Sequence, residues 1–84
     1  MSRIKDGVEQ IIGRRINGLV IKRAKEGGQP TNQLFLLFDD GHYYEFYTYG
    51  CSVGTTSGVA QGSLDEVLDY MNQTLEPVFV KYQE

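Results

Sequence analysis

The most constrained part of the sequence is a pair of β-forming runs, residues 33–39 and 42–49, on either side of Asp40 and Gly41. Asp-Gly is favoured in type I′ two-residue turns, because both turn positions need a positive φ. The pattern therefore predicts a β-hairpin. A two-residue turn also sets the register of the two strands, so that Asp39 and the following strand's first residue, His42, lie opposite each other.

With this register, both faces of the hairpin are apolar. The first face carries Phe35, Leu37, Tyr44 and Phe46. The second face carries Leu34, Leu36, Phe38, Tyr43, Tyr47 and Tyr49, with Glu45 among them. An antiparallel sheet with one face in water normally alternates apolar and polar side chains. We therefore expect this sheet to need cover on both sides.

Two segments have helical periodicity. Aliphatic residues at i, i+4, i+7 and i+8 predict a helix over residues 3–12. Ser63 followed by Glu66 is a capping box, and apolar residues recur at helical spacing from residue 64 to 75. We expect this second helix to end before Pro77, because proline cannot continue a helix.

The remaining segments complete an α+β fold. Residues 14–25 have an apolar β-branched centre and predict a strand, and residues 78–82 predict a C-terminal edge strand. Residues 50–62 are rich in Gly, Ser and Thr and predict a loop, with a loop that contains a short extended piece as the alternative. The expected order is α-β-β-β-α-β, in which a three-strand antiparallel meander and the edge strand pack with two helices. We expect residues 1–84 to form a single domain.

The sequence also excludes several classes of protein. The longest apolar run, residues 34–38, is far shorter than the ~18–20 residues of a membrane span. The first residues lack the apolar core of a secretory signal. A lone cysteine, Cys51, can form neither an internal disulfide nor a zinc site by itself. We therefore expect a cytoplasmic protein without a membrane segment, metal or other cofactor.

Charge is unevenly distributed along the chain. Residues 1–25 hold seven Lys or Arg and two acids (+5), whereas residues 26–84 hold one Lys and nine acids (−8). Basic residues near tyrosines can bind nucleic acid, and a strip of this kind could include Arg14, Arg15, Lys22, Arg23 and Lys25. The chain as a whole carries −3, and the basic half can pair with the acidic half instead. We therefore do not expect nucleic-acid binding.

Two motifs resemble catalytic or ligand sites. A His42–Asp39 pair could orient an imidazole, but Cys51 as nucleophile would lie ~25–30 Å from His42 along an extended strand. Residues 54–58 resemble a phosphate-binding loop only in composition, because they lack a following Gly-Lys-Ser/Thr sequence. We therefore expect a binding protein rather than an enzyme.

Glu45 needs a partner if the face that carries it is buried. A basic residue of the preceding strand could supply one, the candidates being Arg15, Lys22 and Arg23. An ion pair between strands is the simplest arrangement, and a bound cation is the alternative.

The two predicted helices could cover opposite faces of the sheet, or both could cover one face and leave the tyrosine-rich face to another chain or a ligand. The second arrangement is favoured, because two short helices could not fully cover two faces, and it points to an interaction protein. We expect a homodimer that uses an edge strand or an aromatic-rich face. The expected surface consists of Leu34, Leu36, Phe38, Tyr43, Glu45, Tyr47 and Tyr49. One alternative is an acidic inhibitory partner, such as an immunity or antitoxin-like protein. Another is a small-molecule-binding domain with a pocket near residues 50–62, lined by Tyr47, Tyr49 and Cys51.

Overall fold

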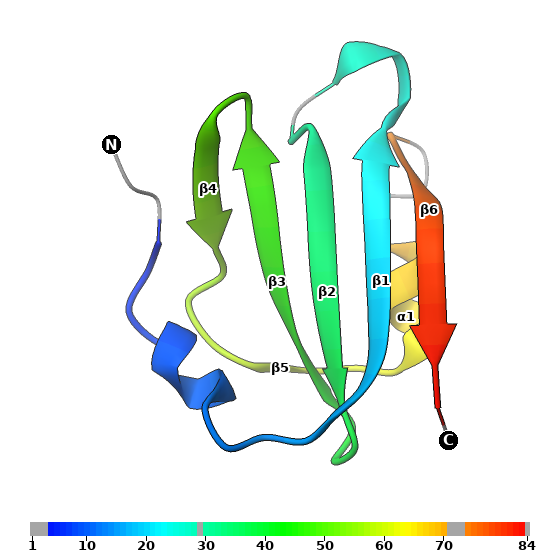
Figure 1. Ribbon diagram of the computed structural model, residues 1–84. Helices are drawn as coiled ribbons and strands as arrows, with labels where there is room; N and C mark the ends of the chain where they lie inside the picture. Colours follow the sequence, from blue (N-terminus) through cyan, green and yellow to red (C-terminus); the bar gives the residue numbers. More distant parts are fainter. Residues whose placement is uncertain (1–3, 29, 71–73, 84) are drawn as a thin grey trace.

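A computed structural model describes residues 4–28, 30–70 and 74–83, and its main feature is one twisted antiparallel sheet (Figure 1). The strands lie in the order β4-β3-β2-β1-β6, and the short β5 pairs with the start of β3. The strands are β1 (Ile16–Ala24), β2 (Asn32–Phe38), β3 (His42–Tyr49), β4 (Ser52–Thr55), β5 (Ala60–Gln61) and β6 (Leu75–Tyr82). The helical segments are the 3-10 turns η1 (Val8–Ile11) and η2 (Lys25–Gly27) and the α-helix α1 (Leu64–Asp69).

The predicted α+β fold with two helices and the order α-β-β-β-α-β is therefore wrong. The described residues form mostly antiparallel sheet, with one short α-helix. The predicted helix over residues 3–12 contains only the single turn η1, because the chain leaves helical geometry at Gly7 (φ 109°) and Gly13 (φ 83°). Its aliphatic residues are not buried as a helical face, and Ile12 is 79% exposed.

The second predicted helix forms at the expected start but is shorter. Its capping box is confirmed: Ser63 accepts a hydrogen bond from the Glu66 backbone, and the Glu66 side chain accepts one from the Ser63 backbone. The helix ends at Asp69, and Leu75 already belongs to β6. The part of the prediction that falls on residues 71–73 lies outside the described residues.

The hairpin between β2 and β3 is confirmed, but its turn differs from the prediction. Gly41 has φ 83° and its N–H donates to the Phe38 carbonyl (3.4 Å), whereas Asp40 does not have a positive φ. This is a three-residue loop built on a type I turn, which ends in a left-handed glycine. The extra loop residue moves the register by one, so that Leu37 lies opposite Tyr43 and Phe35 opposite Glu45.

This one-residue shift turns β3 over relative to β2, because side chains alternate between faces along a strand. Phe35 and Leu37 share their face with Tyr43, Glu45 and Tyr47, whereas the prediction placed them with Tyr44 and Phe46. On that opposite face lie Leu34, Leu36, Phe38, Tyr44 and Phe46. The predicted pairing of Leu34, Leu36 and Phe38 with Tyr43, Tyr47 and Tyr49 on one face is therefore wrong.

The buried core lies between the sheet and α1. Val20, Phe35 and Leu37 of the sheet pack against Val67 of α1, with Tyr43, Leu64 and Leu68 at the periphery. We call this side of the sheet the helix face. In Figure 1, α1 lies behind the sheet, so the helix face points away from the viewer.

The edges of the sheet agree with the sequence prediction only in part. The C-terminal strand is an edge strand as predicted, and its ladder with β1 is shifted at Val78, directly after Pro77. Proline lacks a backbone N–H and is tolerated at such edges and bulges. The predicted loop over residues 50–62 instead contains β4 and β5, because Tyr47 packs over Gly54 and the backbone extends the sheet there.

Candidate interaction surface

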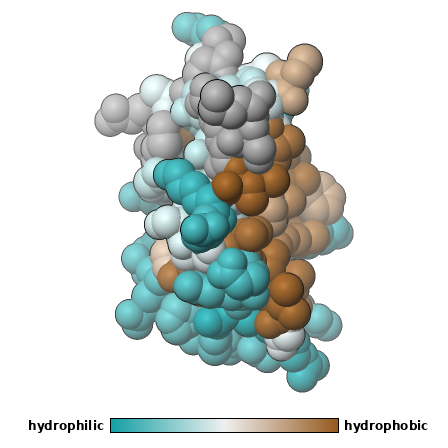
Figure 2. Space-filling view, turned by 90° about the vertical axis from the view of Figure 1, so that its left-hand side faces the viewer, coloured by the Kyte–Doolittle hydropathy of each residue, from teal (hydrophilic) through white to brown (hydrophobic). Residues whose placement is uncertain are grey.

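The side of the sheet opposite α1 is a broad apolar surface, which we call the open face. Five strands contribute to it, and its apolar residues that are not fully buried include Leu19, Ile21, Leu34, Leu36, Phe46, Val53 and Phe79. Val53 and Phe79 are 47% and 43% exposed. Figure 2 views the molecule from the β4 edge, and hydrophobic residues gather on its right, the side that faces the viewer in Figure 1.

The N-terminal segment covers only one end of this face. Lys5 donates its backbone N–H to Thr55 Oγ1 (3.0 Å), and Thr55 is fully buried. The Arg14 guanidinium lies 5.5 Å from the centre of the Phe38 ring, which is also buried. Within residues 4–28, 30–70 and 74–83, the central part of the open face has no covering element (Figure 1).

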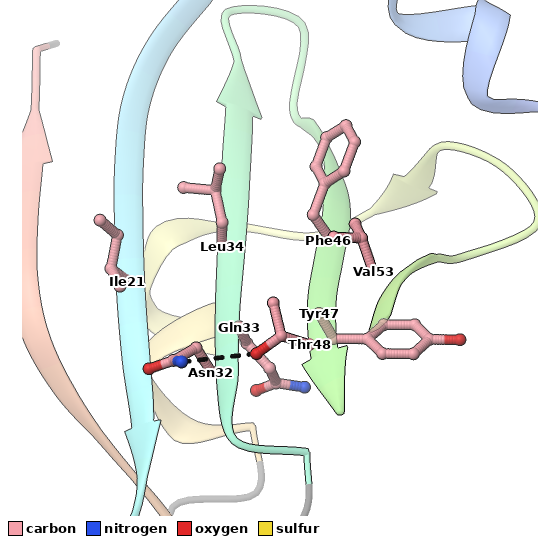
Figure 3. A pocket seen from close by; sticks show the side chains of 8 residues that line it. All are labelled: Ile21, Asn32, Gln33, Leu34, Phe46, Tyr47, Thr48 and Val53. Atoms are coloured by element: carbon pink, nitrogen blue, oxygen red, sulfur yellow. Dashed lines mark hydrogen bonds between the residues drawn. The ribbon is translucent and has the colours of Figure 1, made fainter. Parts of the chain in front are cut away.

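A shallow hollow lies within the open face, with a volume of ≈ 330 Å³. Its apolar side chains project from four neighbouring strands on the side opposite α1, and they are Ile21, Leu34, Phe46 and Val53 (Figure 3). The amide of Asn32 donates to the Thr48 hydroxyl (3.4 Å) at one end of the hollow. The hollow can therefore hold an apolar group and offers polar groups at one end only.

The structure divides the predicted interaction residues between the two faces. Leu34 and Leu36 lie on the open face, and Phe38 lies on the same side under Arg14. The others lie on the helix face: Tyr43, Glu45, Tyr47 and Tyr49. They do not form one surface, because the strand that carries them is turned over by the longer loop.

The predicted ligand pocket is also only partly brought together. Tyr47 lies at the border of the hollow, and its ring stacks edge-to-face on Tyr49 with centroids 5.5 Å apart. Cys51 is exposed in the turn between β3 and β4 and does not line the hollow. The residue of this turn region that does line the hollow is Val53.

Glu45 is buried on the helix face, with 7% of its surface exposed. It accepts a hydrogen bond from the amide of Gln33. Burial raises the pKa of the Glu45 carboxyl above its ordinary value, and the Gln33 hydrogen bond and the charge of Lys22 oppose this effect. Of the three partners considered from the sequence, Lys22 is thus the one whose charge acts on Glu45.

Lys22 is itself fully buried and holds α1 against the sheet. Its ammonium group donates to the carbonyls of Leu68 (2.9 Å) and Tyr70 (2.6 Å), where the helix has unsatisfied acceptors. Burial lowers the pKa of Lys22, while the charges of Asp69 and Glu45 oppose the shift. This cluster of buried charges is occupied by contacts within the chain and has a structural role.

The predicted basic strip is broken up by ion pairs. Arg14 contacts Asp40 (2.6 Å), and two weaker contacts join Arg15 to Asp39 (3.8 Å) and Arg23 to Glu76 (3.6 Å). Each pair joins the basic N-terminal part to the acidic remainder of the chain. Since Lys22 is buried, these residues do not form a continuous basic surface.

The predicted cross-strand pairing of His42 with Asp39 is wrong. The Nδ1 atom of His42 lies 3.2 Å from Oδ1 of Asp40, within the turn. The longer loop removes Asp39 from the position opposite His42. The contact is at the surface and fits a turn-stabilising role.

Three residues that distinguish the open face, Ile21, Val53 and Phe79, are not among the predicted site residues. One signal for them is present in the sequence: Ile21 alternates with Val20 and Lys22, which places it on the same side of the strand as Leu19. Val53 and Phe79 cannot be assigned to a face from the sequence, because the composition of β4 predicts a loop and β6 contains a register shift.

Comparison of the chain with protein-family models, with curated proteins and with solved structures gave no significant match in any of the three. None of the helices in the described part of the chain has the length and apolar character needed to cross a membrane. The open face and its geometry are therefore the basis from which function is inferred.

Proposed function

We propose that this protein is an interaction protein that forms a homodimer, in which the open face of one copy covers the open face of the other. The observation that carries the proposal is that both sides of the sheet are apolar, but among the described residues only one side carries an α-helix. Exposed apolar patches of several hundred Å² usually mark interaction sites. A second copy offers a matching patch, since a two-fold interface brings the same surface together twice.

The size of the open face supports a dimer. Four strands at ~4.8 Å spacing and about six residues at ~3.3 Å give a projected area of roughly 400 Å² per copy. Two copies would bury roughly 800 Å² before β4 and the rim are counted, and these bring the total towards the ~1,000 Å² lower bound for a specific interface. Two sheets pack face to face with ~10 Å between them, so the product would be a sandwich with α1 of each copy outside.

The mass of the protein in solution tests the proposal. Sedimentation equilibrium from about 1 µM to about 1 mM should give a monomer–dimer equilibrium. Ile21→Glu places a charge at the centre of the open face, and it should raise the dissociation constant at least ~100-fold, because a buried unpaired charge is costly. Ile12→Glu is the matched control, since Ile12 is 79% exposed outside the open face and should leave the constant unchanged.

A small apolar ligand in the hollow is the alternative occupant, because ≈ 330 Å³ lies at the small end of ligand-pocket volumes. Native mass spectrometry distinguishes the two. A dimer of unmodified chains supports the proposal, whereas a monomer that carries a bound small molecule contradicts it. A protein that stays monomeric at about 1 mM also contradicts it.

A further inference from the structure

The open face is organised in rows that run across the strands. Phe79, Ile21, Leu34 and Phe46 are consecutive cross-strand partners on β6, β1, β2 and β3. They form an apolar central row. Since neighbouring strands lie ~4.8 Å apart, Phe79 and Phe46 are separated by about 14 Å along this row.

The rows on either side of the central row differ in polarity. On the side of the central row where Asn32 and Thr48 border the hollow, a polar row consists of Glu76, Arg23, Asn32 and Thr48. On the other side of the central row, a mainly apolar row consists of Lys81, Leu19, Leu36 and Tyr44. The open face therefore has a polar end and an apolar end along the strand direction.

The two ends of the central row also differ in shape. Phe79 is 43% exposed on the edge strand, so its ring projects from the surface. The hollow extends from Ile21 and Leu34 to Phe46 and Val53 at the other end (Figure 3). A protruding aromatic ring and a hollow on the same face can fill each other in a two-fold pair, because each contact then occurs twice.

We propose that the two-fold axis of the dimer runs parallel to the strands, between β1 and β2, and seats Phe79 of each copy in the hollow of the other. This inference rests on the proposed function and adds the orientation of the two copies. A rotation about this axis carries the β6 position of the central row onto the β3 position, where the hollow lies. The same rotation places the polar row of one copy over the polar row of the other copy.

The perpendicular orientation is unfavourable. A two-fold axis that runs across the strands would exchange the two ends of the face and place Arg23 and Asn32 over the partner's apolar row. Buried polar groups without hydrogen-bond partners are costly. The polarity of the rows therefore selects the axis along the strands.

A complementation experiment tests this orientation. Phe79→Ala removes the protruding ring, and Val53→Phe fills the hollow from β4. Each variant alone should dimerise at least ~10-fold more weakly than the wild-type protein. Mixed together, they should form heterodimers at concentrations where neither dimerises alone. One wild-type contact is then retained, and the ring introduced by Val53→Phe fills the space left by Phe79→Ala.

Native mass spectrometry of the mixture resolves the heterodimer, since the variants differ in mass, and circular dichroism verifies that each variant is folded. Thr48→Phe fills the same hollow from β3 and replaces Val53→Phe if that variant folds poorly. The orientation alone is overturned if the wild-type protein dimerises and the single variants dimerise as strongly as it does. It is also overturned if the mixture of the two variants forms no heterodimer. A wild-type protein that never dimerises overturns the proposed function as well.

Discussion

The ammonium nitrogen of Lys22 lies 2.6 Å from the carbonyl oxygen of Tyr70, which follows the last residue of α1. This contact joins the centre of the sheet to the end of the helix that covers it. A cation is favourable at this place, because the C-terminus of a helix carries partial negative charge and unsatisfied carbonyls. One buried side chain thus secures the only α-helix of the described residues.

Lys22→Met should lower the free energy of unfolding by about 3 kcal/mol, because it leaves two partly buried carbonyls and the buried Glu45 without a positive partner. Urea denaturation followed by circular dichroism measures the change. Lys5→Met is the matched control, since Lys5 is exposed outside the sheet and its replacement should change stability by less than about 0.5 kcal/mol. Equal effects of the two substitutions would show that Lys22 has no special role.

The stability of the protein should depend on the protonation of Glu45. Its pKa in the folded protein is raised by burial, so the folded state binds this proton more tightly than the unfolded state does. The resulting stabilisation is fully present below the ordinary pKa of a glutamate. It is lost as the pH rises through the raised pKa of the folded protein.

Glu45→Gln should remove this part of the pH dependence, because glutamine does not titrate. Urea denaturation midpoints of both proteins, measured between about pH 4 and pH 8, provide the comparison. The wild-type midpoint should fall relative to that of the variant as the pH rises. Parallel curves over the whole range would contradict the prediction.

The attachment of the N-terminal segment depends on Gly7. A Cβ atom built at Gly7 would lie 1.9 Å from the carbonyl oxygen of Ser57, and the residue has φ 109°. Gly7→Ala should therefore destabilise the protein by about 2 kcal/mol or more, through backbone strain and displacement of the segment from β4. Thermal unfolding measures the loss.

Gly13→Ala is the control for backbone strain. Gly13 has φ 83°, but a Cβ atom there would meet nothing within 4 Å. This variant should show only the cost of a positive φ, about 1 kcal/mol. A Gly13→Ala effect as large as that of Gly7→Ala would mean that the contact with Ser57 contributes nothing.

The turn between β2 and β3 needs a left-handed residue at Gly41. Gly41→Asn should cost less than about 1 kcal/mol, because asparagine tolerates this conformation. Gly41→Val should cost about 2 kcal/mol, since β-branched residues are strongly disfavoured at positive φ. Chemical denaturation of the two variants gives the comparison, and equal stability would argue against this turn geometry.

Local sequence signals predicted several elements correctly. The hairpin, the capping box at Ser63 and the C-terminal edge strand all form. Each depends on residues close together in the chain: a turn sequence, a hydrogen-bond pair three residues apart and a run of β-forming residues. The predicted first helix does not form, because Gly7 and Gly13 leave helical geometry, and Ile4 and Ile12 stay exposed.

The candidate interaction surface was less predictable, because it depends on the number of residues in one loop. Asp39 could belong to the strand or to the turn, and the alternatives differ by a single position. That position decides whether Tyr47 or Phe46 shares a face with Leu34. The residues of β4 and β6 on the open face depend on pairing between distant segments, which a single sequence does not encode locally.

The sequence by itself determined that this chain forms a hairpin too apolar to leave either face fully in water, because nearly every position from 34 to 38 and from 43 to 49 is apolar or aromatic. Tertiary structure decided which side chains share a face and which face α1 covers. The physical reason is that a strand's alternation is local, whereas its register and its cover depend on hydrogen bonds and packing between segments far apart in the chain. Those contacts place Phe79 and Phe46 in one row of the open face, although the two residues lie far apart in the sequence.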